Sequence, residues 1–166
     1  MKLLKTFGEK MNNVHDEERH AVRAVVLDDI GRVAVLYVGK NFHHGLPGGG
    51  IKQGETKLQA LKREVREETG VNAKVLEEVG ITNEYRDFLD PARFEINYAY
   101  IVHENGLRKA PQLTTKELGC DFELKWVEIN KAIELFENDE KRDRKSEFIV
   151  GRDLAILKKA KEIIEE

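Results

Sequence analysis

Residues 49–71 read GGIKQGETKLQALKREVREETGV and join a glycine-rich loop to a stretch crowded with glutamates. Thr56 and Gln59 have the spacing of a capping box, in which each side chain bonds to the other residue's backbone N–H at the start of a helix. Gly70 is suited to the left-handed conformation in which many helices end. The sequence therefore predicts a helix over about residues 55–69, directly after the glycines.

The predicted helix separates apolar residues from acidic ones. An apolar stripe, expected to pack against a sheet, comprises Leu58, Leu61 and Val65. An acidic cluster lies beside this stripe, and its members are related as i, i+3 and i+4: Glu64, Glu67 and Glu68. Such residues are neighbours on a helix surface, and Ala60 on the same side is expected to leave room above their carboxylates.

Clustered carboxylates repel one another, so a positive charge is expected among them. Hard carboxylate oxygens suit Mg²⁺, with Mn²⁺ as a substitute, and the sequence lacks the Cys/His cluster of a structural zinc site. Spacing alone is weak support, because Glu162, Glu165 and Glu166 have the same spacing in the C-terminal tail. A solvated helix end explains that second triple without any metal.

The residues around the first acidic cluster distinguish it from the tail. Gly49 is followed after five residues by Glu55, and after seven more by REVREETGV at residues 63–71. This order resembles the Nudix box at every fixed position, a match expected by chance about once in a hundred million starting residues. The matching residues are Gly49, Glu55, Arg63, Glu64, Glu67, Glu68 and Gly70.

Apolar stretches on either side of the box predict further strands and helices. The predicted strands cover residues 21–27, 32–38, 72–81, 93–102 and 121–129, and the predicted helices cover residues 130–138 and 145–165. Residues 28–31 should turn the first two strands into a hairpin, and residues 39–54 should form a loop. Within 93–102, Phe94, Ile96, Tyr98 and Tyr100 alternate and should share one face.

This order of elements indicates α+β or α/β packing, with a sheet between helices. The resemblance implies an α+β fold of the Nudix type, in which a mixed β-sheet lies between helices as an α/β/α sandwich. No repeat or linker divides the chain, so we expect a single domain over residues 1–166. It would begin with a polar lead-in, residues 1–19, and end with a C-terminal helix, residues 145–166.

The composition excludes several classes of protein. A net charge of −3 argues against a protein that grips long nucleic acid through many phosphates. No stretch approaches the roughly 20 apolar residues of a membrane helix, and the first residues do not have the pattern of a secretory signal. Cys120 is the only cysteine, which excludes an intramolecular disulfide and agrees with a reducing compartment. We expect a cytoplasmic protein that does not bind membranes.

The resemblance implies roles for the residues of the box. Glu64, Glu67 and Glu68 would be metal ligands, together with a backbone carbonyl of the turn at Gly48 and Gly49. Arg63 would orient the glutamates, and Glu55 would pair with Arg63 and lock the loop onto the helix. Such support matters, because loosely held ligands lose metal affinity.

The sequence leaves two positions for the residue that acts as the general base. In some relatives it is a glutamate of the box, here Glu64; in others it is an acid outside the box. Glu117, Asp121 and Glu123 lie in the corresponding region, and we favour Glu117 because its TTKELG stretch is loop-like.

Several residues outside the box are candidates for substrate contact, each with a structural alternative. Arg23 is unusual in an apolar strand and can face the substrate or form an ion pair at the sheet edge. His43 and His44 precede the glycines and can reach a phosphate or be exposed loop residues. Aromatic residues that can stack on a base, or pack at the rim of the core, are Phe42, Tyr85 and Phe88.

Together these features predict a Mg²⁺-dependent pyrophosphohydrolase that cleaves a diphosphate linkage in a small nucleotide substrate, such as a (d)NTP, an oxidised nucleotide or ADP-ribose. The alternative is a domain that binds nucleotide metabolites as a sensor without turnover. An isoprenoid-diphosphate isomerase would need further Cys and Glu motifs that are not visible, and an RNA 5′-end processing enzyme would favour a basic surface. The resemblance leaves a homodimer open.

Overall fold

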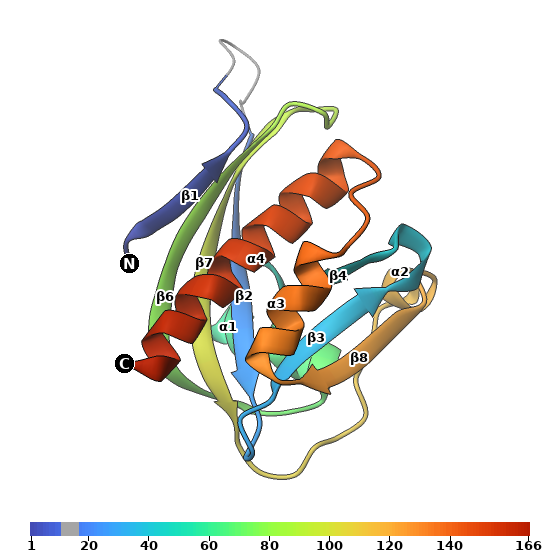
Figure 1. Ribbon diagram of the computed structural model, residues 1–166. Helices are drawn as coiled ribbons and strands as arrows, with labels where there is room; N and C mark the ends of the chain where they lie inside the picture. The colour runs from blue at the N-terminus through green and yellow to red at the C-terminus, as the bar shows by residue number, and fades with distance from the viewer. Residues whose placement is uncertain (11–16) are drawn as a thin grey trace.

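A mixed β-sheet with helices on both faces forms the body of the protein (Figure 1). The computed structural model describes residues 1–10 and 17–166. The strands are β1 (Leu3–Phe7), β2 (Glu17–Leu27), β3 (Val33–Val38), β4 (His43–Gly45), β5 (Gly48–Gly50), β6 (Ala73–Arg86), β7 (Arg93–Glu104) and β8 (Phe122–Val127). The helices are η1 (Gly39–Asn41), α1 (Lys57–Thr69), α2 (Thr115–Leu118), α3 (Ile129–Glu137) and α4 (Arg144–Glu165). Among the described residues, no helix is long and apolar enough to cross a membrane.

The long central strands set the topology of the sheet. The strand order is β1-β6-β7-β2-β3-β4, with β5 added to β2 and β8 added to β3. β2 runs parallel to β7 from Glu17 opposite Arg93 to Leu27 opposite His103, whereas β6 and β7 are antiparallel. The sheet is therefore mixed, as the sequence predicts.

Two apolar cores lie on opposite faces of the sheet. On one face, α3 and α4 cover β2 and β3, with Phe136, Ile156 and Leu157 fully buried (Figure 1). On the other face, α1 packs its Leu61 and Val65 against the aromatic residues of β7. The predicted alternation in β7 is confirmed for Ile96, Tyr98 and Tyr100, which belong to the core on the α1 side, whereas Phe94 stacks on Tyr85 and is not part of that core. This is the predicted α/β/α arrangement.

Helix α1 begins and ends where the sequence predicts. Thr56 and Gln59 form the complete capping box, and Gly70 ends the helix in the left-handed conformation with φ 74°. A Cβ on Gly70 would lie 1.8 Å from the Lys109 carbonyl oxygen, so the close approach of that loop also demands glycine.

The predicted apolar stripe of α1 is wrong at one end. Leu58 is 44% exposed, whereas Ala60, Leu61 and Val65 are completely buried. The buried face of the helix runs from Ala60 to Thr69, and Leu58 lies in the first turn, before that face begins. Ala60 therefore fills the core and does not leave room above the glutamates as expected.

Three further expectations need correction. The predicted lead-in contains β1 and the start of β2. Apolar residues are too few in these two segments to give the alternating pattern of a strand. β2 and β3 pair only at Leu27 and Val33, because β5 pairs with residues 21–23 on the edge of β2 that faces β3. The predicted loop at residues 39–54 contains β4 and β5, each of three residues.

Candidate active site

Two glycines bring the backbone against the acidic face of α1. Gly48 pairs with Arg23 across β5 and β2, and its N–H donates to Glu68 Oε2 at 2.7 Å. A Cβ on Gly48, at φ 149°, would lie 2.1 Å from the Val22 carbonyl oxygen. A Cβ on Gly49 would lie 2.5 Å from Glu64 Oε1. A side chain at Gly48 would push the turn away from β2 and one at Gly49 would push it away from α1, so these two close approaches explain both glycines.

Arg63 holds the loop, the helix and two of the glutamates together. Its Nε and one Nη donate to the two Glu55 oxygens at 2.6 and 2.9 Å, and the same Nη donates to the Gly50 carbonyl at 3.0 Å. Its other Nη donates to Glu64 at 2.5 Å and to Glu67 at 3.3 Å. The hydrogen bonds from Arg63, then the Lys52 N–H, lower the pKa of Glu55 to about 2. The geometry places Arg63 and Glu55 as supports of the acidic cluster.

Glu68 is a buried acid, and within the described residues no arginine or lysine donates a hydrogen bond to it. Burial is the largest cause that raises its pKa well above the ordinary value, and the nearby carboxylates of Glu64 and Glu117 raise it further. The Gly48 N–H opposes this shift but does not cancel it. A cation placed among these carboxylates would relieve their repulsion.

The donor set of the cluster fits a hard divalent cation. Glu64 and Glu68 are buried and Glu67 is about one-third exposed at its side chain, so carboxylate oxygens lie both inside and at the mouth of the site. Among the described residues, no three acidic, histidine or cysteine side chains already converge as a metal centre. Glu64 and Glu67 point instead to Arg63, and Glu68 points to Gly48. The chemistry of the oxygens and the glycine cradle both suit Mg²⁺.

The acids outside the box differ in their relation to this cluster. Glu117 closes the capping box of α2 by accepting from the Thr114 N–H at 2.6 Å, and its charge acts on Glu68. Glu123 is exposed in β8 beside Lys125, at 3.6 Å. The Asp121 backbone carbonyl accepts from the Gly39 N–H. Glu117 is thus the acid of this region that contributes to the electrostatics of the buried glutamate.

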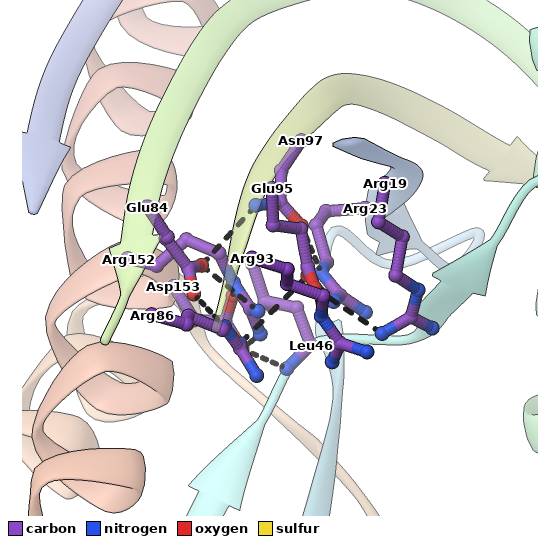
Figure 2. A network of polar contacts seen from close by, with 10 residues as sticks. All are labelled: Arg19, Arg23, Leu46, Glu84, Arg86, Arg93, Glu95, Asn97, Arg152 and Asp153. Atoms are coloured by element: carbon purple, nitrogen blue, oxygen red, sulfur yellow. Dashed lines mark hydrogen bonds and ion pairs between the residues drawn. The ribbon is translucent and has the colours of Figure 1, made fainter. Parts of the chain in front are cut away.

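A cavity of about 270 Å³ extends from Gly48 and Glu68 toward β6, β7 and α4. Arg23 lines it, donates from Nε to Asn97 Oδ1 at 3.1 Å, and lies 3.5 Å from Glu95. The two alternatives for Arg23 are therefore not exclusive, because the side chain faces the cavity and is ion-paired as well. Figure 2 shows it within a network of buried polar groups.

The other candidates outside the box lie in different surroundings. His43 lines the cavity, whereas His44 points to the opposite face of β4 and bonds to Asp139 Oδ1 at 2.7 Å beside Phe136. The structure offers His43, not His44, as the cavity-facing histidine. Phe42 is 44% exposed, with the Arg142 guanidinium 3.7 Å above its ring. Tyr85 packs on Phe94 and Phe88 packs on Phe148, in agreement with the alternative that these aromatic residues serve packing.

Several polar residues around the cavity are not predicted from the sequence: Glu84, Arg86, Arg93, Glu95, Asn97, Arg152 and Asp153. The alternation in β7 contains a signal for some of them. Arg93, Glu95 and Asn97 occupy the positions between the aromatic residues, on the face that α4 covers. Polar residues on a covered face must be paired, and this marks them as a candidate site.

Comparisons with known proteins agree with this geometry. A model of the NUDIX domain matches residues 17–148. Among solved structures, a NUDIX hydrolase from Nitrosomonas europaea is similar with a TM-score of 0.66 at 17% identity, covering 88% of this chain and 90% of that chain. A MutT protein from Methanosarcina mazei gives a TM-score of 0.55 at 20% identity, covering 81% and 91%. A MutT protein from Bacillus halodurans gives 0.54 at 24% identity, covering 70% and 72%. At these identities the solved structures show the fold.

Proposed function

The chain belongs to the NUDIX family, whose members are generally pyrophosphohydrolases, and from that premise we propose that it is a Mg²⁺-dependent hydrolase of a nucleoside-diphosphate-type substrate. The observation that carries this proposal is the buried Glu68, which is near the charges of Glu64 and Glu117 and lines a cavity that arginines also line. At this point the clustered glutamates, whose repulsion a cation would relieve, lie next to the cavity arginines, whose charge an anion would neutralise. A metal-bound diphosphate satisfies both.

In this proposal Glu64, Glu67 and Glu68 hold the divalent cation, with the Gly48 carbonyl as a further candidate ligand. When bound, Mg²⁺ neutralises charge on the diphosphate and lowers the pKa of a coordinated water. Arg63 keeps the carboxylates of Glu64 and Glu67 in place through the contacts described above, and Glu55 fixes Arg63 in turn. These two residues position the ligands.

The remaining roles belong to groups at the edge of the cluster. Glu117 and Glu64 are the two candidates to accept the proton of the attacking water, and Glu117 is the one outside the contacts of Arg63. Arg23 lies at the start of the cavity and is placed to bind a phosphate oxygen with its guanidinium. In-line attack at phosphorus would release a nucleoside monophosphate and a second phosphorylated fragment.

A panel of nucleotides tests this proposal. We expect phosphate-containing products from at least one diphosphate-linked nucleotide in the presence of Mg²⁺, none after chelation with EDTA, and recovery with Mn²⁺. Tight binding of a nucleotide without release of any product would favour the sensor alternative. Binding measured by calorimetry on the same panel separates this outcome from failure to recognise nucleotides at all.

A further inference from the structure

Arginines from distant parts of the chain converge on the cavity beyond Glu68. They come from four elements, and Figure 2 shows their guanidinium groups close together: Arg19 and Arg23 on β2, Arg86 on β6, Arg93 on β7 and Arg152 on α4. Lys145, in the first turn of α4, adds a further cation to the same wall. We call these five arginines the arginine pocket.

The arginine pocket carries more positive than negative charge. Its carboxylates, all fully buried, are Glu84, Glu95 and Asp153. Glu68 adds a fourth carboxylate at the end of the cavity, so five arginines and Lys145 against four carboxylates leave a surplus of two positive charges. Burial of unpaired charge is costly, so the surplus indicates that the pocket receives an anion.

Two of the arginines are committed to structural ion pairs. Arg152 bonds to both Asp153 oxygens, at 2.6 and 3.0 Å, and Arg86 bonds to Glu84 at 2.6 Å. Asp153 also accepts from the Leu46 N–H at 2.9 Å, which fixes α4 to the loop before the glycines. These pairs build the floor of the pocket and do not compete for a ligand.

The other three arginines share a single carboxylate. Glu95 lies 3.2 Å from Arg19, 3.5 Å from Arg23 and 3.6 Å from Arg93, and the last two distances are too long for strong hydrogen bonds. Arg93 Nε is buried and has no hydrogen-bond partner in the described part of the chain. Burial, the largest cause, and the charge of Arg152 lower the pKa of Arg23 to about 10. Donors of these three side chains are therefore available to an anion.

The shape and lining of the cavity define the anion. Its volume of about 270 Å³ is below the 300–1,000 Å³ that is typical of sites for whole drug-sized ligands. Phe122 is the only phenylalanine, tyrosine or tryptophan among its lining residues, so the wall offers no pair of aromatic faces for a nucleobase. Planar guanidinium groups that approach from several directions suit the tetrahedral oxygens of a phosphate.

We propose that the arginine pocket binds a phosphate group of the substrate that is additional to the cleaved linkage, on the fragment that points away from the nucleoside. This inference rests on the proposed function, because it places the cleaved diphosphate at the Glu68 end of the cavity. It predicts that the enzyme prefers a nucleotide whose far end is a phosphate over one whose far end is a neutral sugar. The nucleoside lies outside the pocket.

Binding of inorganic tripolyphosphate, measured by calorimetry with EDTA present, tests the pocket without turnover. We expect the parent to bind it and Arg93→Gln to bind it about tenfold or more weakly, as the loss of a hydrogen bond between charged groups implies. Arg93 is suited to this change because its only ion pair within residues 1–10 and 17–166, to Glu95, is long. Arg32→Gln is the matched control, since it also removes one guanidinium and one ion pair, at the other end of β2, and should bind like the parent.

A kinetic comparison separates the pocket from the proposed function. For each base, kcat/KM is measured on the nucleoside triphosphate and on the corresponding nucleoside diphosphoglucose. We expect Arg93→Gln to lower kcat/KM about tenfold for the triphosphate and to leave the diphosphoglucose unchanged. Equal losses of kcat/KM on both substrates, or a parent without affinity for tripolyphosphate, would contradict phosphate binding in the arginine pocket. Neither result would contradict the proposed hydrolase function. Tripolyphosphate binding that depends on Arg93 without any turnover would overturn the proposed function, and with it the assignment of the bound phosphate to a cleaved substrate.

Discussion

Arg63 makes hydrogen bonds to the loop before α1 and to two of the three proposed metal ligands, so one side chain controls the shape of the acidic cluster. Lysine keeps the charge but cannot reproduce the paired donors to Glu55. We expect Arg63→Lys to lower kcat by about 10- to 100-fold, the usual loss when a ligand's support is removed. Steady-state kinetics on the best substrate of the panel measure this. Arg66→Lys, on the exposed side of the same helix, should match the parent, and an equal loss there would contradict the role of Arg63.

Gly48 and Gly49 should respond differently to alanine. A Cβ on Gly49 would meet the mobile end of Glu64, so Gly49→Ala should displace that carboxylate and lower kcat while the melting temperature changes little. A Cβ on Gly48 would meet the backbone of Val22 at a positive φ. Gly48→Ala should therefore destabilise the fold by about 1–3 kcal/mol. Thermal denaturation and kinetics on both variants check this contrast, and the account fails if Gly49→Ala is fully active.

At the scale of elements, local signals in the sequence predict α1 better than they predict the strands around it. The capping box and Gly70 act within a few residues, so the helix bounds are readable from the chain. β4 and β5 have three residues each and consist mostly of glycine and histidine, which carry no strand pattern. β4 pairs with the nearby β3, but β5 pairs with residues 21–23 of β2, which are distant in sequence. The burial of Glu64 and Glu68 likewise follows from tertiary packing.

The N-terminal cap of α1 supports the site from the helix start. Thr56 accepts from the Gln59 N–H, and Gln59 accepts from the Thr56 N–H at 2.8 Å. Thr56→Ala should lower the free energy of unfolding by about 1 kcal/mol, since one helix N–H loses its partner. Urea denaturation measures the change. Thr56→Ser retains the hydroxyl and should stay close to the parent; an equal loss in both variants would show that the methyl group matters and not the cap.

At the scale of the whole molecule, the arginine pocket depends on segments that only the fold brings together. Arg23 on β2 and Arg152 on α4 have no local signal that relates them, and Arg23 alone stands out in the sequence as a charge in an apolar strand. Arg93 and Glu95 are exceptions, because both alternate with aromatic residues in β7. The sequence thus predicts the acidic half of the site, whereas the basic half requires the tertiary structure.

The dependence of the free energy of unfolding on pH, at acidic pH, should reflect the ion pairs of this pocket. Burial alone would raise the pKa of Glu95, but the charges of Arg86, Arg23 and Arg19 outweigh burial and hold it at about 2, below the ordinary 4.5. Its stabilising contribution, on the order of 3 kcal/mol, is therefore complete above pH 4.5 and is lost as the pH falls toward 2. We expect Glu95→Gln to reduce the dependence of the urea unfolding free energy on pH in this window. An unchanged slope would contradict the shared ion pairs.

We propose that the acidic cluster of α1 holds a cation on which hydrolysis depends. The most direct test compares kcat at saturating Mg²⁺ for the parent, Glu67→Gln and Glu165→Gln. Glu165 is exposed in α4 and pairs with Lys161 at 3.0 Å, in a glutamate triple of the same spacing. The account predicts a loss of about 100-fold or more for Glu67→Gln and none for Glu165→Gln. Full activity of a folded Glu67→Gln variant would contradict the assignment of the cluster as the metal site.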